Sequence, residues 1–303
     1  KDRDIDEIIT KAQELSTKTS LKQRKNIKFS YGQNIIDLKK AVQSDVSKLR
    51  VVLQAAEARE NERVWHRNQT FGDLDDSKIV ELLTGETTVF RRRGEKDDFN
   101  GIIQKHPKRI MFVIDLSSSM SRFNAVDRRL DRLAATIIMI VEALSGFERK
   151  FVYSMIGQDG DSHAIPLVSF GSPPRTDEEK QRLIEEMYHN ANTCTSGDNT
   201  LPAIQYAATQ VIKEKGDDYF VFAISDANLT QYGLSPQVFT KLLTGNSKVH
   251  CHVIFLADMN YGSFLQRNIP STHCSICLST TSLPTVFQDI FKHRVLKKVM
   301  SSL

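Results

Sequence analysis

Cysteine is scarce in this sequence, which holds four in 303 residues, at positions 194, 251, 274 and 277. So few thiols argue against a disulfide framework and fit a reducing compartment. The segment His273–Cys277, with histidines at 250 and 252, has half of the spacing of a zinc site. A second Cys-x-x-Cys pair is absent and both stretches read as strands, so we do not expect zinc here.

Three further absences exclude whole classes of function. No apolar run approaches the ~20 residues of a membrane-spanning helix, so we expect no membrane span. No G-x-x-x-x-G-K-[ST] phosphate loop is present, so this chain is not expected to be an enzyme that hydrolyses ATP. The net charge is only +4, with both signs interspersed, and gives no reason to expect a nucleic-acid partner.

The start of the sequence lacks an initiator methionine and a signal-peptide pattern. It begins at Lys1, so we expect a piece of a longer protein, with any targeting segment upstream. An intracellular location is the corresponding expectation.

Short apolar runs alternate with helical periodicity from Arg109 onward. The runs predict strands over 110–114, 151–156, 164–170, 219–224, 249–256 and 275–278. The periodic stretches predict helices over 130–144, 177–189, 201–213, 263–267 and 283–299, with another beginning at Ser235. This alternation predicts an α/β fold with a mostly parallel central sheet and helices on both faces.

The region before Arg109 has a different pattern. Apolar spacing predicts a helix over 3–16 and a long one over 35–56 that continues toward Trp65. A short helix over 79–83 and a strand over 87–92 follow, the latter interpreted as a solvated edge strand. We therefore divide the chain into a helical extension (1–70), an accessory helix and strand (71–108) and a main domain (109–303).

The first α/β strand ends in the pattern Asp115-x-Ser117-x-Ser119. A carboxylate and two hydroxyls thus follow a central strand, at the edge where open α/β sheets bind ligands. All three are hard oxygen donors, which Mg²⁺ and Mn²⁺ prefer. The alternative is that Asp115 shapes a turn and the serines cap a helix.

The Asp-x-Ser-x-Ser loop resembles the first loop of a von Willebrand factor A (VWA) domain, which forms part of that family's metal-ion-dependent adhesion site. Ser196–Thr200 (SGDNT) is similar to the second loop, and Ile224–Ala227 (ISDA) to the third, with Asp226 as its acid. The resemblance implies a Rossmann-like fold. It also implies that Ser117 and Ser119 bind the metal, while Asp115 and Asp226 hold metal-bound water.

The second loop departs from the family's common G-x-T pattern. Gly197-Asp198-Asn199-Thr200 leaves two candidate ligands. Aligned helix starts favour Asp198, whereas hydroxyl chemistry favours Thr200. An Asp ligand would strengthen cation binding and weaken the attraction for an incoming carboxylate.

The strings SMSRFN, RRLDR and SDANLTQYG resemble the VWA region of large mitochondrial AAA ATPases. This resemblance implies a metal-dependent protein-interaction module, with Mg²⁺ or Mn²⁺ bound here and ATP bound only upstream. Its partner would be a protein that supplies an Asp or Glu ligand, or the AAA ring of the same chain, in the mitochondrial matrix. The integrating subunit of a metal chelatase is an alternative. A metal-dependent phosphohydrolase is another, although Ser117 stands where Asp-based phosphatases carry their acid–base residue.

Overall fold

The computed structural model describes residues 34–60, 64–94, 106–194, 197–226 and 236–296. The chain divides into two units, Lys1–Gly32 and Gln33–Leu303, and all described residues belong to the second. The helix predicted over 3–16 lies outside the described residues. Within the described ranges, no helix is both long and apolar enough to cross a membrane.

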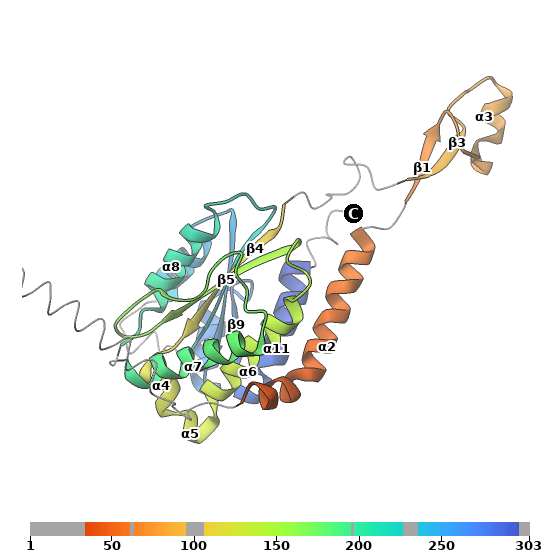
Figure 1. Cartoon of the computed structure of the whole chain (residues 1–303). Helices are drawn as coiled ribbons and strands as arrows, with labels where there is room; N and C mark the ends of the chain where they lie inside the picture. Colours follow the sequence, from red (N-terminus) through yellow and green to blue (C-terminus); the bar gives the residue numbers. More distant parts are fainter. Residues whose placement is uncertain (1–33, 61–63, 95–105, 195–196, 227–235, 297–303) are drawn as a thin grey trace, which may run out of the picture. The chain divides into compact units, whose positions relative to one another are not determined.

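Six strands form the central sheet (Figure 1). They are β4 (Lys108–Asp115), β5 (Phe151–Gln158), β6 (Ile165–Val168), β7 (Tyr219–Ser225), β8 (Val249–Leu256) and β9 (Cys274–Cys277). The order is β6-β5-β4-β7-β8-β9, and every pairing is parallel except that of β6 with β5. The predicted α/β class with a mostly parallel sheet is confirmed.

Helices cover both faces of this sheet because its strands are apolar on both sides. Ile110, Phe112 and Ile114 of β4 face one layer, and Met111 and Val113 face the other. The first layer contains α2 (Ile35–Glu60), α6 (Arg129–Leu144), α7 (Asp177–Thr193) and α11 (Leu283–Phe291). The second contains α8 (Thr200–Val211), α9 (Pro236–Thr244) and α10 (Met259–Asn268).

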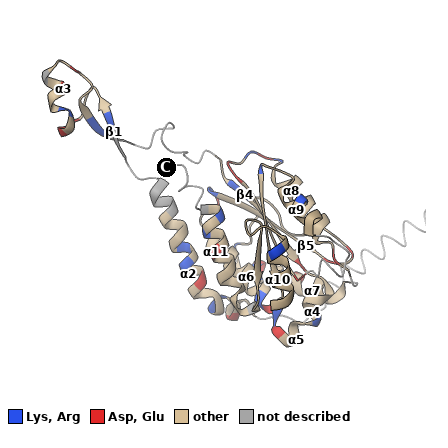
Figure 2. Cartoon of the chain, turned by 180° about the vertical axis from the view of Figure 1, so that it is seen from behind, with Lys and Arg blue, Asp and Glu red and all other residues tan. Residues whose placement is uncertain are grey.

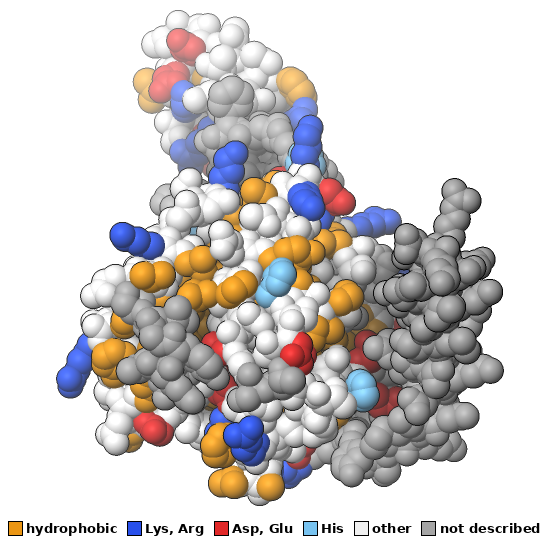
Figure 3. All heavy atoms as spheres, turned by 90° about the vertical axis from the view of Figure 1, so that its left-hand side faces the viewer, with side chains coloured by type: hydrophobic (Ala, Val, Ile, Leu, Met, Phe, Trp, Pro, Cys, Tyr) orange, Lys and Arg blue, Asp and Glu red, His pale blue; other side chains and the backbone are white. Residues whose placement is uncertain are grey.

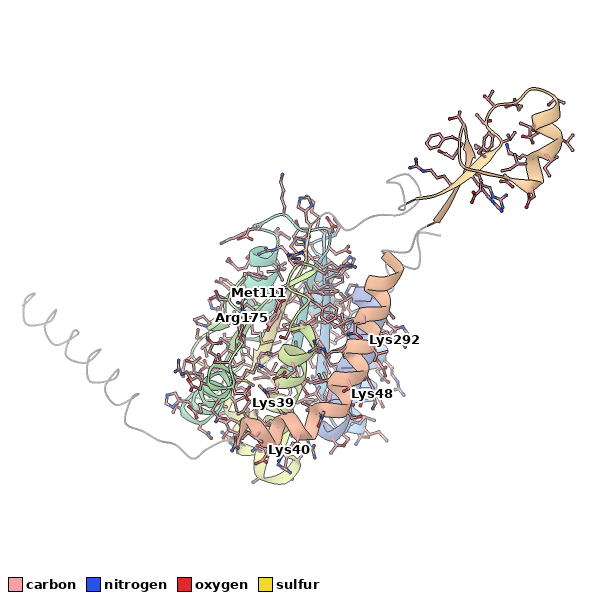
Figure 4. All side chains as sticks on the ribbon, turned by 45° about the vertical axis from the view of Figure 1, so that its right-hand side comes forward. Lys39, Lys40, Lys48, Met111, Arg175 and Lys292 are labelled. Carbon is pink, nitrogen blue, oxygen red and sulfur yellow. The ribbon has the colours of Figure 1, made fainter. Side chains whose placement is uncertain are left out.

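The long N-terminal helix α2 is part of the main hydrophobic core. Leu38, Val42, Leu49 and Leu53 are at most 2% exposed and pack in the same cluster as α6 and α11. Lys39 bridges to Glu142 of α6 at 3.0 Å and to Asp177 of α7. Figure 4 labels Lys39 on α2, and Figure 2 shows charges of both signs along this helix. This helix, which the sequence places in the N-terminal extension, therefore packs on the α/β domain.

Two expectations before Arg109 are wrong. The helix does not continue toward Trp65: α2 ends at Glu60, and Trp65 lies in β1 (Val64–Gln69). The predicted edge strand is β3 (Phe90–Gly94), which lies between β1 and β2 (Asp73–Leu74) in a small antiparallel sheet. A 3₁₀ turn (Asp76–Lys78) and α3 (Ile79–Leu83) join β2 to β3.

The structure also differs from the sequence interpretation around several helices. The stretch after β4, expected as a loop, forms α4 (Ser118–Arg122) and α5 (Asn124–Asp127). Helix α10 starts earlier than expected, because Asp258 caps it by accepting the N–H of Tyr261. A short 3₁₀ turn, Thr280–Ser282, precedes helix α11. The helix ends at Phe291, earlier than expected, and a π turn over Lys292–Leu296 follows it.

Candidate metal centre

The candidate site lies at the carboxyl ends of β4 and β7, two neighbouring parallel strands. The chain runs outward from β4 to β5 and β6 on one side and to β7, β8 and β9 on the other. The strand order therefore reverses beside β4. In open α/β sheets this is the place where connecting loops leave room for a ligand.

Asp115 ties the first and third loops together. Its Oδ1 accepts the N–H of Ser117 at 2.9 Å, and its Oδ2 accepts the hydroxyl of Ser225 at 2.8 Å and the N–H of Asp226 at 3.2 Å. The residue is 1% exposed. Burial, followed by repulsion from Asp226 and Asp198, raises the pKa of Asp115 to about 7.

The two serine hydroxyls point to each other and to the third loop. Ser117 Oγ lies 2.9 Å from Ser119 Oγ, and Ser119 Oγ donates to Asp226 Oδ1 at 2.8 Å. Ser117 stands at the N-cap of α4 but its side chain makes no capping hydrogen bond. Its hydroxyl therefore does not serve the capping role that was the alternative interpretation.

Both candidate ligands of the second loop lie at the start of α8. Asp198 Oδ1 accepts the N–H of Thr200 at 2.9 Å and its hydroxyl at 2.5 Å. The Thr200 hydroxyl also contacts Gln158 Nε2 at 3.2 Å and Ser225 Oγ at 3.1 Å. Thr200 is 1% exposed, whereas Asp198 is half-buried, and burial raises the pKa of Asp198. The choice between them stays open on this geometry.

Three residues at the site were missed by sequence reasoning. Ser225 and Gln158 join the loops as described above, and Arg129 Nη1 donates to Asp226 Oδ2 at 2.6 Å. Ser225 directly precedes Asp226, so its position in the third loop was a usable signal. Nothing in the spacing links Arg129 to Asp226, because 97 residues separate them.

The donor set fits a hard divalent cation. Adjacent ligands in an octahedron with metal–oxygen distances of about 2.1 Å lie roughly 3.0 Å apart. The Ser117–Ser119 oxygen pair, at 2.9 Å, matches that spacing. Within the described ranges, no three His, Cys, Asp or Glu side chains are arranged to hold a metal by themselves. A centre here would therefore depend on the hydroxyls.

The histidine and cysteine side chains near β8 and β9 are engaged in other contacts. His252 contacts Thr272 O at 3.2 Å and Ser275 Oγ at 2.9 Å, and burial lowers its pKa to about 4. His273 Nδ1 contacts Cys251 O at 2.8 Å. Burial raises the pKa of Cys274 to about 12, so this thiol stays protonated. The contacts of His252 and His273 join β8 to the segment around β9.

Comparison with known proteins gives a sequence relative and several similar structures. No protein-family model matches the chain. Mouse von Willebrand factor A domain-containing protein 8 is 37% identical over 260 residues, a match that covers 86% of this chain and 14% of the mouse protein. The chain thus spans about one seventh of the length of that relative.

Similarity to solved structures is partial. The pilus adhesin SpaC of Lactobacillus rhamnosus GG is 10% identical with a TM-score of 0.49, over 64% of this chain and 31% of that chain. The VWA domain of SpRpn10 is 13% identical with a TM-score of 0.44, over 59% and 94%. The domain assignment rests on the sequence relative and the strand order. Together these two observations show that the chain contains a von Willebrand factor A domain.

Proposed function

We propose that the chain is a metal-ion-dependent protein-interaction module. The observation that carries the proposal is the convergence of Ser117, Ser119 and Asp226, which come from two strand ends and lie 2.8–2.9 Å apart. A set of buried and half-buried oxygens at the edge of a parallel sheet suits a hard cation better than it suits any organic cofactor.

Each loop has a proposed role at the metal. The hydroxyls of Ser117 and Ser119 bind Mg²⁺ or Mn²⁺ directly, and Asp198 or Thr200 supplies a ligand from the second loop. Asp115 and Asp226 hold the loops and accept hydrogen bonds from metal-bound water, as acids outside the coordination sphere commonly do. When bound, the cation supplies a positive centre that attracts an anionic oxygen.

The partner is proposed to be a protein that carries an Asp or Glu side chain. Exposed apolar residues lie on segments that follow the carboxyl ends of parallel strands in the same sheet: Phe123 (46% exposed) and Val126 (82%) after β4, and Met259 (71%) after β8. Hydrophobic side chains also gather on the face shown in Figure 3. Such residues supply contact area beside a carboxylate, which alone binds weakly.

The larger protein is proposed to be a AAA ATPase of the mitochondrial matrix, in which this module couples ATP-driven movement to a client or adaptor. Two observations support this context: the 37% identity to the much longer mouse protein and the resemblance of the loop strings. ATP would bind upstream, and the AAA ring itself is one candidate partner.

The position of Asp115 argues against a phosphohydrolase. A nucleophilic carboxylate needs an oxygen directed at the substrate. Both oxygens of Asp115 accept hydrogen bonds from the loops, and the residue is 1% exposed. Its geometry suits it to holding the loops in place.

Calorimetric titration of the purified chain with Mg²⁺ and Mn²⁺ tests the proposed function. We expect saturable binding by the wild type, and a loss of at least about tenfold in affinity for Ser119→Ala, which removes one ligand. Ser118→Ala is the matched control, because Ser118 is adjacent and, within the described part of the chain, its hydroxyl makes only a 3.5 Å contact with Arg122. Equal binding by the two variants would contradict the assignment.

A further inference from the structure

A guanidinium group, which does not itself bind metal cations, is fixed at the edge of the site. Arg129 Nη1 donates to Asp226 Oδ2 at 2.6 Å, while the other oxygen of Asp226 accepts from Ser119. The Arg129 side chain is 18% exposed, and that of Asp226 is 5% exposed. The pair is therefore largely shielded from water. In such an environment two charges interact more strongly than they do at the protein surface.

The local chain holds this guanidinium in one orientation. Arg129 Nε and Nη2 both donate to the Asp127 carboxylate, at 2.9 and 2.6 Å. The guanidinium also lies over the ring of Phe123, 4.6 Å from its centroid. Arg128, at φ +56°, turns the backbone just before α6, and Asp127 accepts the N–H of Arg129 at 3.0 Å. Side chain and backbone are thus fixed by the same acid.

The charges at the site explain what this arrangement does. Asp115, Asp198 and Asp226 can each carry a negative charge. Burial and repulsion from the other two acids raise the pKa of Asp115. With a divalent cation alone, the loaded site would keep one negative charge and repel a carboxylate. Arg129 adds one positive charge beside Asp226 and so offsets one of these three acids, while Asp127, the other carboxylate that Arg129 contacts, carries a further negative charge.

We infer that Arg129 is a fixed cationic member of the site that limits its affinity for Mg²⁺ and, in the loaded site, offsets the extra charge of Asp198 so that a partner's carboxylate is accepted. The inference rests on the proposed function. It names Arg129 as a residue that tunes specificity without binding the metal.

The test is calorimetric Mg²⁺ titration of the full chain as wild type, Arg129→Gln and Arg129→Lys. We expect Arg129→Gln to bind Mg²⁺ about tenfold more tightly, because a positive charge beside the cation is gone. Arg129→Lys keeps the charge and should bind as the wild type does. Arg122→Gln is the control for loss of a charge: Arg122 is exposed and contacts only Ser118 among the described residues, so its affinity should change by less than about twofold.

Thermal unfolding with and without Mg²⁺ is the second readout. Without metal, Arg129→Gln should be less stable than the wild type, because Asp226 loses its cation. The Mg²⁺-induced rise in Tm should nevertheless be larger in the variant than in the wild type. If Arg129→Gln folds poorly, Arg129→Met is used instead, because the apolar methionine side chain can still pack on Phe123.

The outcomes separate this inference from the proposed function. Mg²⁺ binding by the wild type with equal or weaker binding by Arg129→Gln overturns the inference and leaves the proposed function standing. Tighter binding by both Arg129→Gln and Arg129→Lys also overturns it, since charge would then not be the cause. Absence of binding in every variant overturns both, whereas binding only after removal of Arg129 supports the inference and contradicts a working site in the wild type.

Discussion

At the scale of single residues, the buried carboxyl of Asp115 determines how the site depends on pH. Folding raises its pKa from 3.8 to about 7 through burial and the neighbouring acids. The proton is therefore held more tightly in the fold, and its contribution to the stability of the metal-free protein is complete below pH 3.8. That contribution is lost as the pH rises through 7.

We expect Mg²⁺ affinity to rise between pH 5.5 and about 7 and to level off above it, because the cation competes with the proton on Asp115. Titration in a series of buffers from pH 5.5 to 8.5 measures this. The dependence should shrink in Asp115→Asn, which cannot ionise. A wild-type Mg²⁺ affinity that stays constant over the whole pH range would show that protonation of Asp115 does not affect metal binding.

The second-loop ligand can also be tested at this scale. The Thr200 hydroxyl already contacts Asp198, Gln158 and Ser225, while Asp198 is less buried and is an acid that can supply a carboxylate ligand. We therefore expect Asp198→Asn to weaken Mg²⁺ binding by about tenfold or more. Thr200→Val removes the hydroxyl at nearly constant side-chain shape and should weaken Mg²⁺ binding less than Asp198→Asn does. The reverse order of effects would assign the ligand to Thr200.

Sequence reasoning reached some site residues and missed others for a physical reason. The loops of Asp115, Asp198 and Asp226 each follow a strand or open a helix, so periodicity and motif locate them. Arg129 could not be found in this way, because its contact with Asp226 exists only after β4, α6 and β7 have packed together. Gln158 was hidden likewise, since its amide meets the second loop across 41 residues.

At the scale of elements, buried strands were predicted well because each is a short apolar run between polar segments. The ends of helices were harder to predict. The charged run after residue 56 continues a helical pattern, and nothing in it marks the change to β1 beside Trp65. The helices α4 and α5 are short and polar, so their sequence looks like a loop, yet they carry Ser119 and Asp127 to the site.

Helix α2 should be essential to the stability of the domain. Leu49 is 1% exposed and packs in the core with α6, so Leu49→Ala should lower the free energy of unfolding by about 2–5 kcal/mol. Val51, two residues further along the helix and 63% exposed, is the matched control. Val51→Ala should change the free energy of unfolding by less than about 0.5 kcal/mol. Urea denaturation of both variants measures the difference. A small effect at Leu49 would mean that α2 is not part of the folded core.

At the scale of the whole molecule, the fold and the site depend on the same feature. A mostly parallel sheet buried on both faces brings the ends of β4 and β7 together, and their loops supply polar oxygens where the strand order reverses. Around it, α2, α6, α7 and α11 form one packed layer. A module built in this way can present a ligand site at one edge while its helices support the sheet.

The most direct test of the central claim is the position of Mn²⁺ by anomalous scattering in crystals of the wild-type chain. We expect one Mn²⁺ ion bound by the hydroxyl oxygens of Ser117 and Ser119, at about 2.2 Å, with Asp198 or Thr200 as the next protein ligand. The same map would show which of the two it is. At saturating Mn²⁺, an empty site with Ser119 still donating to Asp226 would contradict the account.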